Sequence, residues 1–324
     1  MDDDDKYNNN ADQNVKEEFE IQDPFKIICF DLHELIFQHF TGSDLLVMSE
    51  VSQEWFDLTN SSKNVTKIKL KCENSSNRSL LYKAKHFRAL RKSSRQYANM
   101  KINYDTSTLV DSIKILRQYG ETVERLEISE KSAEDLFLNT QEWRNLKKLK
   151  LGSMSRNMSS YLLHDKLQLE TLIIDDEFNF EQCGSAVTNF LISQRDLKVF
   201  YVLGGSKKSP NQCGLKIFYS MKIFGRVCDF PFKLEKLFVG FCHGIYGELQ
   251  DHIQNGLLYF INIQSNNLQE LIVLCVPNKQ FLNIIFSECP KLKTIRLSGR
   301  IFYHRSNDLL NLNINQNIEE LRIG

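Results

Sequence analysis

The hexamers LKKLKL at residues 146–151 and LETLII at residues 169–174 share one pattern, with apolar side chains at the first, fourth and sixth positions. Successive copies begin 23 to 37 residues apart. Recurrence at such a period is typical of a repeat protein, in which each unit contacts mainly its neighbours. The pattern runs through most of the 324-residue chain, with copies beginning at residues 65, 97, 123, 146, 169, 197, 234, 268, 292 and 318.

Each hexamer predicts a strand, and helical spacing of apolar residues precedes several of them. TSTLVDSIKILRQYG at 106–120 and ELQDHIQNGLLYFINI at 248–263 both place apolar side chains on one helix face. This alternation predicts an α/β fold, although ten unrelated strands of an ordinary α/β sheet are the alternative. The repeats resemble leucine-rich repeats over residues 65–324. The resemblance implies a horseshoe solenoid with parallel strands on its concave face, and loop insertions in the long repeats after 197 and 234.

In such a strand the side chains between the apolar motif positions point the other way. We therefore expect them on the concave face, where they form a basic, then an apolar, then a polar region. An apolar patch beside a basic one indicates protein binding, unless the loops inserted after residues 202 and 239 fold over it. The basic residues are Lys67, Lys69, Lys71, Lys101, Arg125, Lys148 and Lys150. The apolar ones are Ile173, Val199, Tyr201, Leu203, Phe238, Ile272 and Leu274, and the polar ones are Thr294, Arg296, Glu320 and Arg322.

A second apolar segment, IFQHFTGSDLLVMSEVSQEWFDL at 36–58, precedes the repeats. Helical spacing predicts one helix before Thr41-Gly42-Ser43 and a second after it, capped by Ser43 or Asp44. A unit of about 40 residues rarely supports its own core. The remaining apolar surface must therefore contact either the repeats or another protein.

This segment resembles an F-box over about residues 26–62, although Ile28-Cys29 stands where leucine-proline is usual and His33 occupies a normally apolar position. The matching residues are Ile36, Phe37, Phe40, Asp44, Leu45, Val51, Ser52, Trp55 and Leu58. The resemblance implies docking onto a Skp-family adaptor of a cullin–RING ubiquitin ligase, and a helical cap on the solenoid is the alternative. The expected adaptor contacts are Ile28, Leu32, Ile36, Phe40, Leu45, Val51 and Trp55.

The expected organisation is a disordered acidic N-terminus at 1–22, a helical module at 23–62 and a solenoid at 63–324. Residues 1–6 contain DDDDK, which is either native or a tag remnant, and the last hexamer runs to the end of the sequence, so the array is either complete or truncated at Gly324. Zero net charge, short apolar runs and eight cysteines without CxxC pairs favour a cytoplasmic or nuclear protein with reduced thiols. The basic stretch at 74–104 is read as a solvated convex helix, so nucleic-acid binding is not expected.

No catalytic motif is present, and Cys242, His243 and His252 do not have the spacing of common zinc sites. We expect neither cofactor nor metal, and no enzymatic activity of the chain itself. Together the two resemblances predict a substrate receptor of an SCF-type ubiquitin ligase, which binds a protein substrate. A cytosolic leucine-rich-repeat scaffold without a ligase role is the alternative.

Overall fold

The computed structural model describes residues 28–61, 63–73, 95–103, 114–115, 117–129, 143–152, 167–175, 180–203, 217–218, 230–240, 248–274, 279–297 and 317–323. The predictions for the N-terminal residues 1–22, the basic stretch at 74–94 and the insertions after 203 and 240 lie outside these residues.

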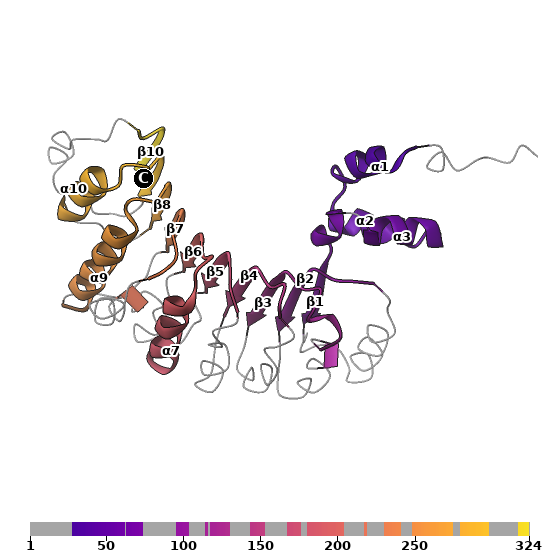
Figure 1. Cartoon of the computed structure of the whole chain (residues 1–324), viewed down its shortest axis with the longest axis horizontal. Helices are drawn as coiled ribbons and strands as arrows, with labels where there is room; N and C mark the ends of the chain where they lie inside the picture. The colour runs from indigo at the N-terminus through magenta and orange to yellow at the C-terminus, as the bar shows by residue number, and fades with distance from the viewer. Residues whose placement is uncertain are drawn as a thin grey trace, which may run out of the picture.

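Ten parallel strands form one sheet whose order is the order of the chain, so each strand pairs only with its sequence neighbours. The expected α/β class is confirmed, and this strand order is that of a solenoid. The sheet curves, with its concave side open (Figure 1). The strands are β1 (Lys69–Glu73), β2 (Asn99–Asn103), β3 (Arg125–Ser129), β4 (Lys148–Leu151), β5 (Thr171–Ile174), β6 (Val199–Val202), β7 (Lys236–Val239), β8 (Glu270–Val273), β9 (Thr294–Leu297) and β10 (Glu320–Ile323).

Three helices, α7 (Phe180–Ser193), α9 (Glu248–Gln264) and α10 (Lys279–Glu288), lie along the convex side of the sheet (Figure 1). The core fills the space between these helices and the strands. Phe200 of β6 contacts Phe218 and Phe260, with ring centroids 6.4 and 6.2 Å apart, and all three rings are fully buried. Such aromatic clusters supply much apolar burial per residue.

The strand register aligns the fourth and sixth motif positions of successive repeats. Leu149 pairs with Leu126 on one side and Leu172 on the other, and all three are buried. The predicted inward and outward alternation is therefore confirmed in β4 to β9, where outward residues are half-buried or exposed.

The first repeat differs from its predicted alignment. Leu70 pairs with Met100, whereas the motif beginning at residue 65 would place Ile68 there. Because a shift of two residues keeps each side chain on the same face, Lys69 and Lys71 remain on the concave side. The prediction for Lys67 was wrong, because this residue ends the 3-10 helix η2 (Lys63–Lys67) rather than lying in a strand.

Buried amide side chains tie successive repeats together, a feature that the sequence analysis missed. Gln194, just after α7, donates from Nε2 to the Leu167 carbonyl and accepts at Oε1 from the Leu169 N–H, both at 2.8 Å. Gln264 accepts from the Leu234 N–H at 2.9 Å. These bonds satisfy backbone groups at the strand entries, where no strand partner reaches them.

Three short helices precede the sheet: α1 (Phe30–Phe37), α2 (Gly42–Met48) and α3 (Gln53–Ser61). The predicted second helix is therefore split in two. The hydroxyl of Ser52 accepts from the Trp55 N–H at 3.3 Å, which starts a new helix there. The cap of α2 is Thr41 rather than Ser43 or Asp44. Asp44 instead completes a capping box by accepting from the Thr41 N–H at 2.8 Å.

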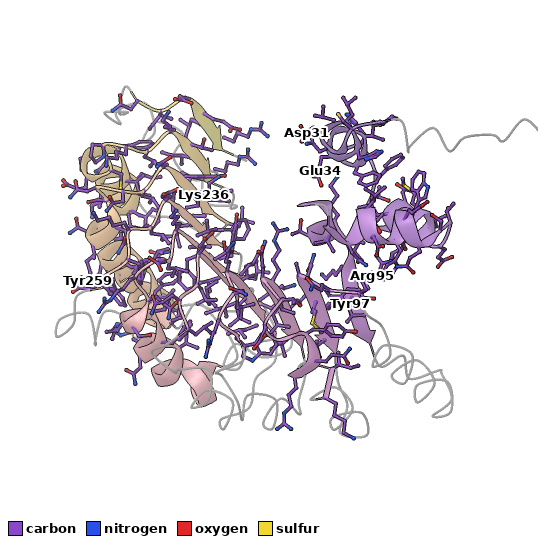
Figure 2. The ribbon with its side chains drawn as sticks, turned by 45° about the vertical axis from the view of Figure 1, so that its right-hand side comes forward. Asp31, Glu34, Arg95, Tyr97, Lys236 and Tyr259 are labelled. Atoms are coloured by element: carbon purple, nitrogen blue, oxygen red, sulfur yellow. The ribbon has the colours of Figure 1, made fainter. Side chains whose placement is uncertain are left out.

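These helices, which we call the helical module, cover the β1 end of the solenoid core. Phe37 and Leu45 are buried in the same cluster as Ile68. Arg95 hydrogen-bonds Ser49 and lies over the Phe56 ring, 4.9 Å from its centroid. Figure 2 shows Arg95 at this junction, next to the first strands. The helical module thus caps the array, which is one of the two roles considered for it.

Candidate functional site

One row of side chains crosses the concave face from the first strand to the last. The register places one residue from each strand in this central row, and its chemistry changes from basic through apolar to paired charges. In strand order the row consists of Lys71, Lys101, Glu127, Lys150, Ile173, Tyr201, Phe238, Ile272, Arg296 and Arg322.

The apolar patch consists of Ile173, Tyr201, Leu203, Phe238, Ile272 and Leu274, which are all half-buried. Tyr201 and Phe238 lie on neighbouring strands with ring centroids 5.4 Å apart. Leu203 and Leu274 directly follow β6 and β8 on the same face. The structure thus brings together six of the seven apolar residues selected from the sequence, and the seventh, Val199, pairs in register with Thr171 and Lys236 beside them. Their binding of a partner stays a prediction.

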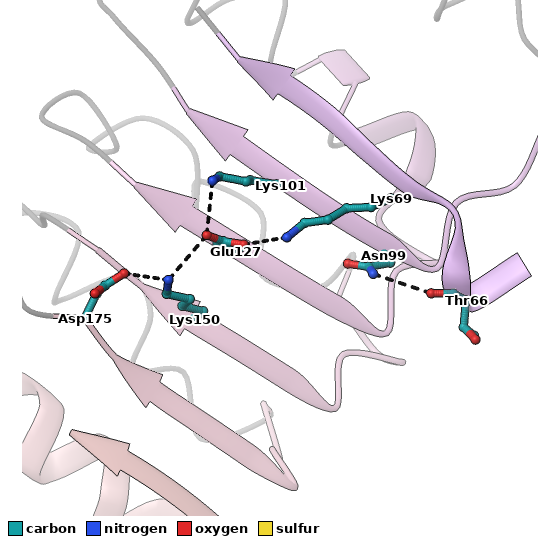
Figure 3. A network of polar contacts seen from close by, with 7 residues as sticks. All are labelled: Thr66, Lys69, Asn99, Lys101, Glu127, Lys150 and Asp175. Carbon is teal, nitrogen blue, oxygen red and sulfur yellow. Dashed lines mark hydrogen bonds and ion pairs between the residues drawn. The ribbon is translucent and has the colours of Figure 1, made fainter. Parts of the chain in front are cut away.

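The basic cluster consists of Lys69, Lys71, Lys101, Arg125, Lys148 and Lys150, from strands β1 to β4. Glu127 lies at its centre and is 2.6 Å from Lys69 Nζ, and 3.4 Å from Lys101 and Lys150 (Figure 3). Lys150 also contacts Asp175 at 2.7 Å. The six cations were predicted from the sequence but Glu127 was not, although the same alternation places residue 127 on this face.

The cluster has more positive than negative charge. Burial alone would raise the pKa of Glu127, but the Lys69 hydrogen bond and the charges of Lys150, Lys69 and Lys101 outweigh it and lower that pKa. Burial, together with the charges of Arg125 and Lys69, lowers the pKa of Lys148 despite attraction by Glu127. In the part of the chain that the structure describes, Arg125 and Lys148 are exposed and have no acid within 4.0 Å.

At the other end of the concave face, three cations contact two glutamates. Lys236 contacts Glu270 at 2.9 Å, and Glu320 contacts both Arg296 at 3.3 Å and Arg322. Figure 2 shows Lys236 on the arm of the solenoid away from the helical module. The two ends of the face therefore differ in free positive charge, with the apolar patch between them.

A second surface lies on the helical module. Leu32 and Val51 are exposed, whereas Ile36, Phe40 and Trp55 are partly buried against the core and Ile28 is half-buried. Leu45 is fully buried, so it belongs to the core and not to an accessible surface. Leu45 is therefore removed from the expected adaptor contacts. The cause is α2, which turns Leu45 toward Ile68 at the solenoid end.

The structure adds three residues to this surface, Leu35, Leu46 and Val47, which are 53, 38 and 66% exposed. Of the six exposed large apolar side chains among the described residues, five lie between residues 32 and 51. The apolar density of the sequence signals such a surface, but which side chains remain outside depends on how the module packs against β1.

The described residues contain no group of three or more potential metal ligands, and none of their helices is long and apolar enough to cross a membrane. Cys242 and His243 lie outside the described residues, and His252 is exposed on α9. Burial raises the pKa of the Cys289 thiol to about 12, with Glu288 adding to the effect, which disfavours the reactive thiolate. No protein-family model matches this chain, and no curated protein matches it either.

Proposed function

We propose that this chain is the substrate-recognition subunit of an SCF-type cullin–RING ubiquitin ligase, and that it works in the cytoplasm or nucleus. In this proposal the helical module is an F-box that docks a Skp-family adaptor, and the solenoid is a leucine-rich-repeat array that binds the substrate protein. Such a receptor contributes proximity rather than a catalytic group.

The observation that carries the proposal is the concentration of exposed apolar side chains on the helical module. A module that only capped the core would have no reason to expose Leu35, Val47 and Val51 together. The surface is also separate from the apolar patch on the concave face, so two proteins can bind at the same time. This two-site arrangement supports a receptor that connects a substrate to a ligase.

The test is co-purification of the full chain with a Skp-family adaptor. Val47 and Val51 are 66 and 67% exposed, so changing both to Glu should leave the fold intact. We expect the Val47→Glu/Val51→Glu variant to weaken adaptor binding by at least about 2 kcal/mol, roughly thirty-fold, as loss of a central contact does. Ile263→Glu is the control, because Ile263 is 37% exposed but lies on α9. Equal binding by all three proteins would contradict the F-box assignment.

A scaffold without a ligase role is the second candidate, favoured by the burial of Phe37 and Leu45 against the first repeat. The concave double variant Tyr201→Ser/Phe238→Ser separates the two. For a ligase receptor, this variant should bind the adaptor normally while ubiquitination of the recruited substrate stops. A chain that binds partners through the concave face but never binds an adaptor would support the scaffold instead.

A further inference from the structure

The two ends of the concave face differ in how much of their positive charge is paired with acids. Of the six cations in the basic cluster on β1 to β4, Lys69 and Lys101 contact Glu127, and Lys150 contacts both Glu127 and Asp175. On β7 to β10, Lys236, Arg296 and Arg322 each contact a glutamate. A negatively charged ligand is therefore attracted to the first end of the face and not to the second.

We propose that the concave face binds an extended protein segment with an Asp/Glu-rich end over the basic cluster and an aliphatic or aromatic end over the apolar patch. This inference rests on the proposed function only in taking the segment to belong to the substrate. It specifies what that substrate must contain and in which orientation it binds.

The basic cluster and the apolar patch lie on adjacent strands of the sheet. Lys150 of the basic cluster pairs in register with Ile173 of the apolar patch, and Tyr201 and Phe238 follow on the next two strands. Neighbouring strands lie about 4.8 Å apart, so β1 to β8 cover about 34 Å. An extended chain advances about 3.3 Å per residue, so about ten residues reach from one region to the other.

Two features favour a protein segment over a nucleic acid. Five of the six cations are lysines, and only Arg125 offers the planar guanidinium that stacks on bases and binds backbone phosphates in a bidentate way. The apolar patch also lacks a parallel line of cations, which a nucleic-acid backbone would need along its whole length. An acidic and apolar peptide matches both halves of the surface.

The experiment measures binding of the full chain to fluorescein-labelled ten-residue peptides by anisotropy at low salt. The first peptide has five glutamates followed by Leu, Trp and Leu with serine spacers. Matched peptides replace the glutamates by lysines or by phosphoserines, or replace the apolar residues by serines, and a ten-nucleotide oligouridine completes the set. We expect the acidic and apolar peptide to bind at least ten-fold more tightly than every other probe.

Two variants should change this affinity in opposite directions. Arg125→Gln/Lys148→Gln removes two exposed cations that have no acid within 4.0 Å among the described residues, and it should weaken binding at least ten-fold. Glu127→Gln removes the central negative charge and should strengthen binding several-fold. The control Lys198→Gln/Lys233→Gln has the same charge change at exposed lysines before β6 and β7, outside the row, and should bind like wild type.

The inference is overturned if the phosphoserine or RNA probe binds most tightly, or if the control double variant loses as much affinity as Arg125→Gln/Lys148→Gln. It is also overturned if Glu127→Gln weakens binding although circular dichroism shows the variant to be folded at the assay temperature. Adaptor binding is measured on the helical module with separate variants. Failure of the peptide test is therefore distinguishable from failure of the proposed ligase role.

Discussion

At the scale of single residues, one glycine allows the helical module to approach the solenoid. A Cβ atom at Gly42 would lie 2.3 Å from the Lys67 carbonyl oxygen and 2.9 Å from its carbon. Both are backbone atoms, which cannot rotate away as a flexible side chain does. The first turn of α2 therefore needs glycine for close contact and not for an unusual backbone conformation.

We expect Gly42→Ala to lower the free energy of unfolding by about 1–3 kcal/mol, because α2 must move away from Lys67. Urea denaturation of both proteins measures the change. Ser43→Ala is the neighbouring control, since Ser43 is exposed and the change adds no atom near the backbone of η2. Equal stability of wild type and Gly42→Ala would show that α2 does not lie as close to Lys67 as described.

Glu127 is the residue whose charge holds the basic cluster together. Because its folded-state pKa is lowered, its stabilising effect is present above its ordinary pKa of 4.5 and is lost as the pH falls through the folded value. Glu127→Gln should therefore reduce the free energy of unfolding at neutral pH by about 0.5–1 kcal/mol, the range for partly exposed pairs.

The difference between wild type and Glu127→Gln should disappear in acid, where wild-type Glu127 is itself neutral. Urea titrations between pH 7 and pH 3 check this dependence. Glu124→Gln provides the comparison, because Glu124 has a single partner, Lys147 at 3.5 Å. A stability difference that stays constant down to pH 3 would rule out the ionised Glu127 as its source.

At the scale of elements, Lys67 connects η2 to the end of α1. Its ammonium donates to the carbonyls of Phe37, Gln38 and Phe40 at 3.1, 2.7 and 3.1 Å. Carbonyls at a helix C-terminus have no partner within the helix, and a cation there also interacts favourably with the helix dipole. The Lys67 side chain therefore fixes the position of the C-terminal end of α1 relative to η2.

We expect Lys67→Met to weaken this attachment by about 1–2 kcal/mol, because three charge-assisted hydrogen bonds are lost while the apolar stem is kept. Amide hydrogen exchange should become faster in α1 and remain unchanged in β5 to β9. Lys71→Met, on the exposed side of β1, is the control. Uniformly faster exchange throughout the chain would mean that Lys67 supports the whole fold and not this joint.

At the scale of the whole molecule, stability is distributed along a row of repeats. Each strand pairs with its neighbours in the sequence, so removal of one end should leave the remainder folded. The helical module, in contrast, is not expected to stay folded alone, because the solenoid covers its buried residues Phe37 and Leu45.

Residues 63–324 alone should therefore unfold cooperatively, but with a free energy of unfolding about 1.5–3 kcal/mol lower, since the deletion uncovers Ile68. Residues 1–62 alone should show no cooperative transition. Circular dichroism melts of both fragments and of a control lacking only residues 1–22 test this. A sharp melt of the fragment 1–62 would contradict its dependence on the solenoid.

The side of each strand that faces the core could be predicted from the sequence alone. Alternation is a local property of the extended chain, so Ile173, Tyr201, Phe238 and Ile272 could be assigned to one face without knowing their neighbours. The α/β class followed for the same reason, because the spacing of apolar residues within one repeat decides strand or helix. The two-residue error in the alignment of β1 left Lys69 and Lys71 on the predicted face, because side chains of a strand alternate between its faces with a period of two residues.

The tertiary structure decided how distant residues meet. Lys69 and Glu127 are 58 residues apart, and their contact depends on the register of three strands and not on any local pattern. The contact of Lys67 with α1, the burial of Leu45 and the exposure of Val47 depend likewise on how the helical module packs against η2. Whether a charge is paired or a side chain is exposed depends on two segments that contact each other. A single segment of sequence contains only one of the two partners.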